Sequence, residues 1–140
     1  LNAIRWTDAE KGTPTPGYSM PDTPSDKLPQ FLNDYIEFYK TPRGFHERSI
    51  SNKVWTATTL LSFLNFPILA YANEINVPTL IVAGENAHSR YMSEDAYQAI
   101  GTDKKELFVV PGARHIDFYD NQGGVVPFDK LETFFKTNLQ

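Results

Sequence analysis

Ionisable side chains follow two apolar stretches of this sequence that have the character of buried strands. The stretch Glu106 to Val110 ends at Pro111 and Gly112, and His115 follows three residues after Gly112. A histidine held at the exit of a strand can act as a general base, because its pKa lies close to neutral pH. Whether His115 has this role depends on the partners that the rest of the chain provides.

A second polar loop offers such partners. Gly84 to Arg90 follows the apolar stretch Thr79 to Gly84 and contains Glu85 and His88. If the two apolar stretches are neighbouring parallel strands, about 4.8 Å apart, side chains from the two loops meet. A carboxylate on one loop and an imidazole on the other form the orienting half of a Ser-His-acid arrangement. The acid fixes the tautomer of the histidine, and the histidine takes and returns a proton.

The local patterns predict the elements that would position these loops. Thr79–Gly84 and Glu106–Val110 are short, continuous, rich in β-branched residues and bounded by Pro and Gly, which is typical of buried parallel strands. A helix is predicted to start at Ser93, and a closing helix is predicted over Val126–Leu139 with a stripe of phenylalanine and leucine. The order strand, helix, strand, helix predicts a βαβα unit.

The first half of the chain is predicted to be different in character. Residues 1–30 contain closely spaced prolines, which fix φ and lack an N–H donor, and we expect an extended arm. Pro29–Tyr39 has the apolar spacing of a helix, and Val54–Ala72 predicts two short helices bent at Pro67. The expected organisation is an arm over 1–30, a helical cap-like segment over 31–75 and an α/β unit over 76–140.

Composition excludes several classes of function. With 140 residues, 41% of them apolar and 21% charged, the chain is long enough for one soluble globular core. A net charge of −4 without a basic cluster argues against a nucleic-acid partner, and no apolar run is long enough to span a membrane. The absence of cysteine excludes disulfides and thiolate chemistry and fits the cytoplasmic location that we expect.

Two long phrases carry a family resemblance. PTLIVAGENAHSRYMSEDAYQAI and KELFVVPGARHIDFYD resemble the C-terminal end of an alpha/beta-hydrolase, and most closely the dienelactone-hydrolase-like bacterial hydrolases. EFYKTPRGFHERS and SFLNFP resemble phrases that lie between the sixth and seventh strands of those proteins. The resemblance covers the chain from about Gln30 onward. It implies an α/β fold: two parallel strands of a hydrolase sheet with flanking helices, preceded by a helical cap-like segment.

The resemblance also assigns the catalytic candidates. His115 matches the histidine that follows the eighth strand of the family. The acid of the family commonly ends a Gly-x-x-Asp phrase after the seventh strand, and here that position is Ala87. Glu85 is the nearest carboxylate and our first choice for the acid. Glu94 and Asp95 are poorer candidates, since acidic residues at that point suit the start of a helix.

Three further residues are candidates for binding substrate. Arg90 ends the first loop, Tyr91 follows it, and both are expected at the mouth of the substrate site, with His88 beside them. The alternative is that Arg90 pairs with Glu94 one helical turn on and that His88 is a structural residue.

The nucleophile is the main departure from the family. The family places its serine in Gly-x-Ser-x-Gly between a strand and a helix. Gly17-Tyr18-Ser19-Met20-Pro21 is the only look-alike here, and it has no apolar strand before it and a proline where the helix would begin. We therefore expect the C-terminal part of a serine hydrolase that acts on an ester, thioester or lactone, that needs no cofactor, and that is inactive alone.

Two other interpretations remain open at the level of sequence. The chain could be a non-catalytic module of the same descent that binds a partner or associates with itself, in which case His115 has no reaction to serve. Association, either with itself or with the N-terminal half of a hydrolase, is expected in both cases. A metal site formed by His88, His115 and Asp117 is the third interpretation, although no ligand spacing recurs on one element.

Overall fold

The computed structural model describes residues 1–49 and 54–139. The chain forms two compact units, Leu1–Pro67 and Ile68–Gln140. Residues 50–53, which fall within the expected cap-like segment, and residue 140 lie outside the described residues. Among the described residues, none of the helices is both long enough and apolar enough to cross a membrane.

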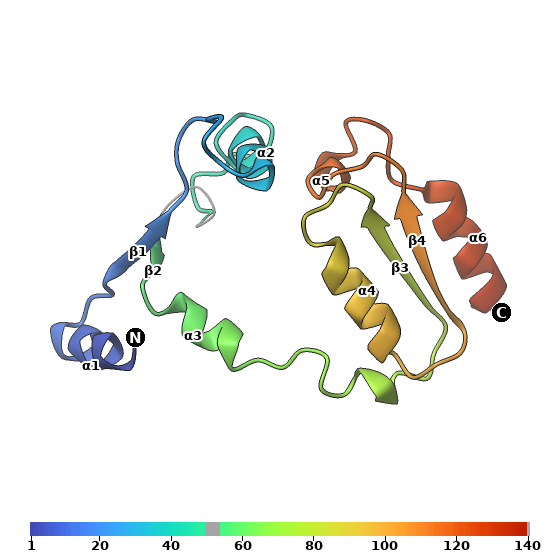
Figure 1. Cartoon of the computed structure of the whole chain (residues 1–140), viewed down its shortest axis with the longest axis horizontal. Coiled ribbons are helices and arrows are strands. Elements are labelled where there is room, and N and C mark those ends of the chain that lie inside the picture. Colours follow the sequence, from blue (N-terminus) through green and yellow to red (C-terminus); the bar gives the residue numbers. More distant parts are fainter. Residues whose placement is uncertain (50–53, 140) are drawn as a thin grey trace. The chain divides into compact units, whose positions relative to one another are not determined.

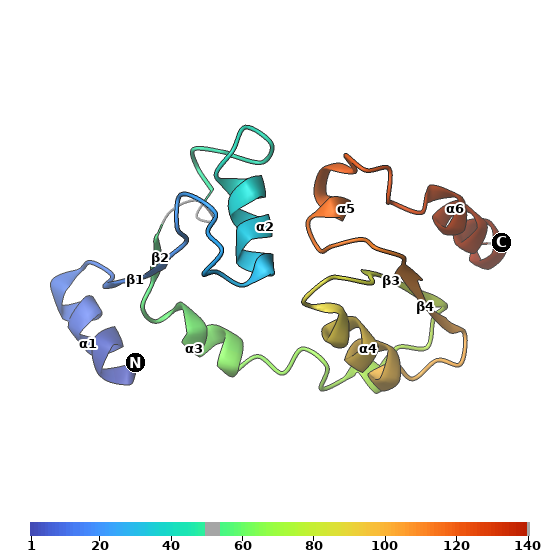
Figure 2. The ribbon, with the colours of Figure 1, turned by 45° about the horizontal axis from the view of Figure 1, so that its top comes forward.

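The second unit is built on a pair of parallel strands, as predicted. Strands β3 (Thr79–Gly84) and β4 (Lys105–Val110) pair in register from Thr79 with Lys105 to Gly84 with Val110. Helix α4 (Arg90–Ala99) connects them and packs on one face of the pair. Helix α6 (Phe128–Asn138) lies on the other side (Figures 1 and 2). This arrangement of a helix on each face is the layering that parallel strands require.

Helix α6 covers its face incompletely. Lys130 connects it to β4 through an ion pair with Glu106 at 2.5 Å, and its ammonium lies 5.8 Å from the centre of the Phe108 ring. The predicted apolar stripe is only partly buried, since Phe128 is 63% exposed and Phe135 is 50% exposed. The two strands therefore cover only part of the apolar face of α6.

Short helical turns complete the second unit. The turn η2 (Ala72–Glu74) precedes β3, and α5 (Asp117–Asp120) follows β4. The amide of Gly101 donates to Ala72 O at 3.2 Å, and a Cβ at Gly101 would lie 1.9 Å from Asn73 O. Only glycine allows η2 and the end of α4 to approach this closely.

The first unit corrects the prediction of an extended arm over residues 1–30. Helix α1 (Asn2–Lys11) forms there and ends at Gly12, whose φ of 68° is left-handed. The closely spaced prolines begin only after this glycine, so nothing in residues 2–11 prevents a helix. The proline-rich part contains strand β1 (Pro16–Ser19), which pairs antiparallel with β2 (Val54–Thr56).

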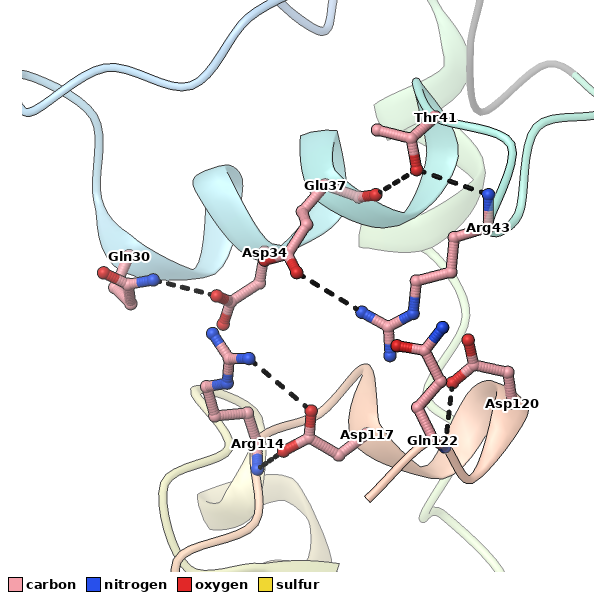
Figure 3. Close-up of polar contacts among 9 residues, drawn as sticks. All are labelled: Gln30, Asp34, Glu37, Thr41, Arg43, Arg114, Asp117, Asp120 and Gln122. Carbon is pink, nitrogen blue, oxygen red and sulfur yellow. Dashed lines mark hydrogen bonds and ion pairs between the residues drawn. The ribbon is translucent and has the colours of Figure 1, made fainter. Parts of the chain in front are cut away.

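Helix α2 (Gln30–Tyr39) forms as predicted and holds the proline-rich part in place. Asn33 exchanges two hydrogen bonds with the backbone of Ser25, at 3.0 and 2.9 Å, and Lys40 pairs with Asp22 at 2.8 Å. At the end of α2 the Thr41 hydroxyl donates to Glu37 O at 2.6 Å and accepts from the amide of Arg43 at 3.3 Å (Figure 3).

The prediction of two short helices over Val54–Ala72 is right for one helix before Pro67 and wrong for the rest. Its first residues form β2, where the β-branched Val54 and Thr56 suit a strand, and helix α3 (Thr59–Leu64) follows. The helix ends at Leu64, with Asn65 as its C-cap, because the residue before Pro67 is kept out of the helical region. Between Pro67 and the short turn η2, the described residues form no helix.

Candidate functional site

Four hydrogen bonds connect the loop that follows β3 to the loop that follows β4. The amide of Glu85 donates to Val110 O at 3.0 Å, and the amide of Asn86 donates to Ala113 O at 2.9 Å. In return, the Glu85 carboxylate accepts from the amide of Gly112 at 2.7 Å, and the Asn86 side chain donates to Gly112 O at 3.1 Å. The two loops therefore meet as the parallel register predicts, and Glu85 and Asn86 hold them together.

Close approach of the loops requires the glycine that ends β3. A Cβ at Gly84 would lie 2.4 Å from Ala113 O and 3.2 Å from the Phe118 ring. On the side of β4, Ala113 and Ile116 are buried, with 2% and 0% of their surface exposed. His115 stands between these two anchored residues, so its backbone is fixed by the core.

Both ring nitrogens of His115 have hydroxyl partners. Ser89 Oγ lies 2.7 Å from Nδ1, and Tyr119 OH lies 2.8 Å from Nε2. Ser89 comes from the loop after β3, where it precedes α4, and its side chain makes no capping bond to that helix. Tyr119 lies four residues beyond His115, on α5, so one helical turn brings its ring against the imidazole.

The electrostatic environment of His115 disfavours the imidazolium. Burial lowers the pKa of His115 below its usual range, and the neighbouring His88 lowers that pKa further. The centroids of the two imidazole rings are 5.3 Å apart. A histidine with a lowered pKa is neutral at physiological pH, which is the state in which it can accept a proton.

Two charged residues of the His115 loop, Arg114 and Asp117, bind each other and stabilise the loop. The amide of Arg114 donates to the Asp117 carboxylate at 2.7 Å, and the Arg114 guanidinium lies 3.7 Å from the other oxygen of that carboxylate (Figure 3). Asp117 thus closes the turn between β4 and α5, a common role for aspartate in turns.

A pocket of about 230 Å³ adjoins the histidine. Ser89, Arg90, His115 and Tyr119 are among the residues that line it. Arg90 also pairs with Glu94 at 2.8 Å, as the alternative reading of the sequence anticipated.

The remaining candidates lie away from the ring nitrogens. Tyr91 is 55% exposed on the first turn of α4, and helix α4 begins at Arg90 rather than at the predicted Ser93. Glu94 and Asp95 therefore lie in the second turn of this helix and not at its start. Ser19, the serine of the elbow look-alike, lies in the exposed strand β1 rather than between a strand and a helix.

The structure brings His115 together with Ser89 and Tyr119 rather than with Glu85, whose carboxylate binds the Gly112 amide. Sequence analysis missed both hydroxyl partners. The spacing of Tyr119 four residues after His115 was an available signal, since residues four apart share a helix face. Ser89 carried a weaker signal, because a serine before a helix ordinarily caps it.

The metal interpretation gains no support from this geometry. Asp117 is engaged with Arg114, and across the described ranges 1–49 and 54–139 no group of three or more His, Cys, Asp or Glu side chains is arranged to hold a metal ion.

Comparison with known proteins identifies longer bacterial relatives. The chain is 49% identical over 142 residues to "Uncharacterized protein PA2218" of Pseudomonas aeruginosa, which covers 99% of this chain and 37% of the relative. It is 31% identical over 120 residues to "Uncharacterized protein YcjY" of Escherichia coli, covering 84% of this chain and 37% of that protein. No family model matches the chain.

A solved structure shares the fold. The crystal structure of the hypothetical protein PA2218 from Pseudomonas aeruginosa superposes with a TM-score of 0.84 at 46% identity, covering 98% of this chain and 42% of that one. The chain therefore has the fold of one part of a larger bacterial protein, and it spans about two fifths of the length of the relatives that it matches.

Proposed function

We propose that this chain carries the general base of a serine hydrolase with an alpha/beta-hydrolase fold, and that the base is His115. The observation that supports this most is its position: His115 follows the second of two parallel strands, and both of its ring nitrogens are hydrogen-bonded. In open α/β sheets, ligands bind beyond the carboxyl ends of the strands, which is where this histidine lies.

The chemistry of such a base is acyl transfer. A serine hydroxyl bonds to the acyl carbon of an ester, thioester or lactone while its proton passes to Nε2 of the histidine. The imidazolium then returns that proton to the leaving alkoxide or thiolate, and a water molecule repeats the sequence to release the acid. The lowered pKa of His115 suits the first of these proton transfers.

The nucleophile and the oxyanion donors are proposed to come from the rest of a longer protein. The lengths of the relatives support this, because this chain spans only 37% of each of the two curated ones. Arg90 is the best supported of the three substrate-binding candidates, since it lines the pocket beside His115. His88 and Tyr91 are proposed to contribute at its rim.

A chimera tests this proposal directly. The 140-residue chain replaces the aligned segment of the Pseudomonas relative, and the chimera is treated with a fluorophosphonate and analysed by intact mass and peptide mapping. We expect one serine outside the transplanted segment to be labelled, and we expect His115→Ala to abolish the labelling. His46→Ala, which removes an exposed histidine of the first unit, is the matched control.

Two results would overturn the proposal. A chimera that folds but is not labelled has no activated serine, and a chimera that is labelled equally well with His115→Ala does not use His115 as its base. An adduct on the isolated chain, lost in His115→Ala, would instead mean that the nucleophile lies within these residues.

A second candidate function is a non-catalytic module that associates through apolar surface. The observation in its favour is the exposure of large apolar side chains, among them Phe63 at 63% and Tyr71 at 75%. Exposed apolar surface of this kind marks interaction sites. This candidate predicts a stable assembly, no labelling, and no effect of His115→Ala on that assembly.

A further inference from the structure

The two hydroxyls that bind His115 differ in how well they donate. A neutral imidazole has one N–H donor and one acceptor nitrogen, so only two arrangements satisfy both partners. In one, Nδ1–H donates to Ser89 Oγ and Tyr119 donates to Nε2. In the other, Ser89 donates to Nδ1 and Nε2–H donates to Tyr119.

The acidity of the phenol favours the first arrangement. A tyrosine O–H, with a pKa near 10, is a stronger donor than the much less acidic alkyl hydroxyl of serine. Tyr119 is therefore the better donor to Nε2, and Ser89 is left as the acceptor at Nδ1. This is the tautomer in which Nε2 is basic, as a general base in a Ser-His-acid arrangement requires.

We propose that Ser89 is the positioning residue of His115, and that its hydroxyl takes the place at Nδ1 that a carboxylate occupies in a Ser-His-acid arrangement. Tyr119 completes the arrangement by occupying Nε2 until a nucleophile hydroxyl replaces it. The inference rests on the proposed function in taking His115 as the base, but it concerns the ring itself and can be measured without activity.

The position of the missing acid supports this assignment. The family's Asp position is Ala87, two residues before Ser89, and the nearby carboxylate of Glu85 is engaged by the Gly112 amide at 2.7 Å. Ser89 Oγ is the group at 2.7 Å from Nδ1. The Ser89 side chain makes no capping hydrogen bond to α4. Its hydroxyl binds His115 instead, and the helix lacks the stabilisation that a serine cap would give.

A hydroxyl orients the ring without adding charge. A carboxylate at this place would stabilise the imidazolium and raise the pKa of His115, whereas a serine leaves burial and His88 to lower that pKa. Two further titratable or charged groups lie near the ring: Tyr119 on α5, and Arg90, which lines the same pocket. The expected consequence is a base that stays neutral to lower pH than one held by an acid.

The experiment is ¹⁵N NMR of the His115 ring in the 140-residue chain, since the ¹⁵N shifts of the two nitrogens report which of them carries the proton. We expect the Nδ1–H tautomer in the wild-type chain. We expect Ser89→Ala to change the ratio of tautomers by about five-fold, the factor that corresponds to the loss of one ordinary hydrogen bond, and Ser89→Thr to restore it.

Two further variants sharpen the result. Ser93→Ala removes another serine that lines the same pocket, one turn along α4, and is expected to leave the ratio unchanged. Ser89→Asp places a carboxylate at Nδ1 and is expected to shift the midpoint of the His115 titration upward. If circular dichroism shows that Ser89→Ala does not fold, the titration of Ser89→Asp still tests whether the side chain at position 89 acts on Nδ1 of His115.

The inference fails if the wild-type ring is protonated at Nε2, if Ser89→Ala leaves the tautomer ratio as it was, or if Ser89→Asp leaves the midpoint unmoved. The proposed function fails separately. If the ring responds to Ser89 while the chimera is not labelled, Ser89 positions a histidine that has no nucleophile to serve. If the chimera depends on His115 while the ring ignores Ser89, the base is held by other groups.

Discussion

His115 should make the stability of the second unit depend on pH. Its pKa is lowered in the folded chain by burial and by His88, while an unfolded chain titrates near the usual value of about 6.5. The unfolded state therefore binds the proton first as the pH falls. The stability that the neutral ring contributes is complete above about pH 6.5 and is lost as the pH falls through the folded pKa.

The measurement is chemical denaturation at several pH values between about 5 and 8, for the wild-type chain and for His115→Asn. We expect the loss of stability on acidification to be smaller in the variant. If the free energy of unfolding falls equally with pH in the two chains, groups other than His115 cause the acid sensitivity.

Glu85 allows a direct test of the acid predicted from the sequence. Its carboxylate accepts from the Gly112 amide, and the amide oxygen of a glutamine can accept the same bond. We expect Glu85→Gln to change stability little and Glu85→Ala to cost about 1 kcal/mol. In the chimera, Glu85→Gln should still be labelled. A loss approaching the about 10⁴-fold known for an orienting aspartate changed to an amide would restore Glu85 as the acid.

At the residue scale, the sequence predicts the place of His115 but not its partners. A run of β-branched and apolar residues predicts a strand, and His115 comes shortly after the end of that strand. The partners depend on side-chain rotamers across two loops. The aspartate that would identify the acid is absent, because its position is Ala87. In addition, no local pattern indicates that Ser89 binds the His115 ring instead of capping a helix.

At the scale of elements, Gly84 controls how closely the loops after β3 and β4 approach. A methyl group at this position would overlap Ala113 O, which is backbone and cannot turn away. We expect Gly84→Ala to destabilise the chain by about 1–3 kcal/mol, as overpacking does elsewhere, and to disturb the NMR signals of the His115 ring.

Gly123→Ala is the matched control for this substitution. The added methyl group there would lie 3.4 Å from the Val125 side chain, which is ordinary contact. Thermal unfolding of the two variants separates the cases: similar losses in both would point to the flexibility of glycine, and not to the approach of the loops, as the cause.

Elements were predictable where one local signal dominated. The two parallel strands and helix α2 follow from continuous apolar runs or from a clear helical spacing. Helix α1 was not predicted because the prolines after Gly12 dominate the composition of residues 1–30, although none of them lies within the helix. The strand β2 was missed because its three residues pair with a distant segment, and pairing of that kind leaves no local pattern.

At the scale of the whole molecule, the exposure of apolar side chains is the dominant property. Six large apolar residues between positions 60 and 71 of the sequence are between 59% and 77% exposed: Leu60, Phe63, Leu64, Phe66, Ile68 and Tyr71. We expect the purified chain to associate as its concentration rises, because water is displaced from these side chains when copies meet.

Sedimentation velocity over a range of concentrations checks this expectation. The sedimentation coefficient should rise with concentration in the wild-type chain and rise less when Phe63 and Phe66 are both changed to glutamate. A chain that remains monomeric throughout would mean that these side chains find cover within one molecule.

The register of β3 with β4 determines which residues of the two following loops lie beside each other. Thr79 pairs with Lys105, and each later pair keeps the same offset. Beyond the last pair of the strands, side-chain hydrogen bonds join Asn86 to Gly112 and Ser89 to His115, each pair again 26 positions apart in the sequence. A shift of β3 against β4 by one residue would therefore bring a different residue of the first loop to His115.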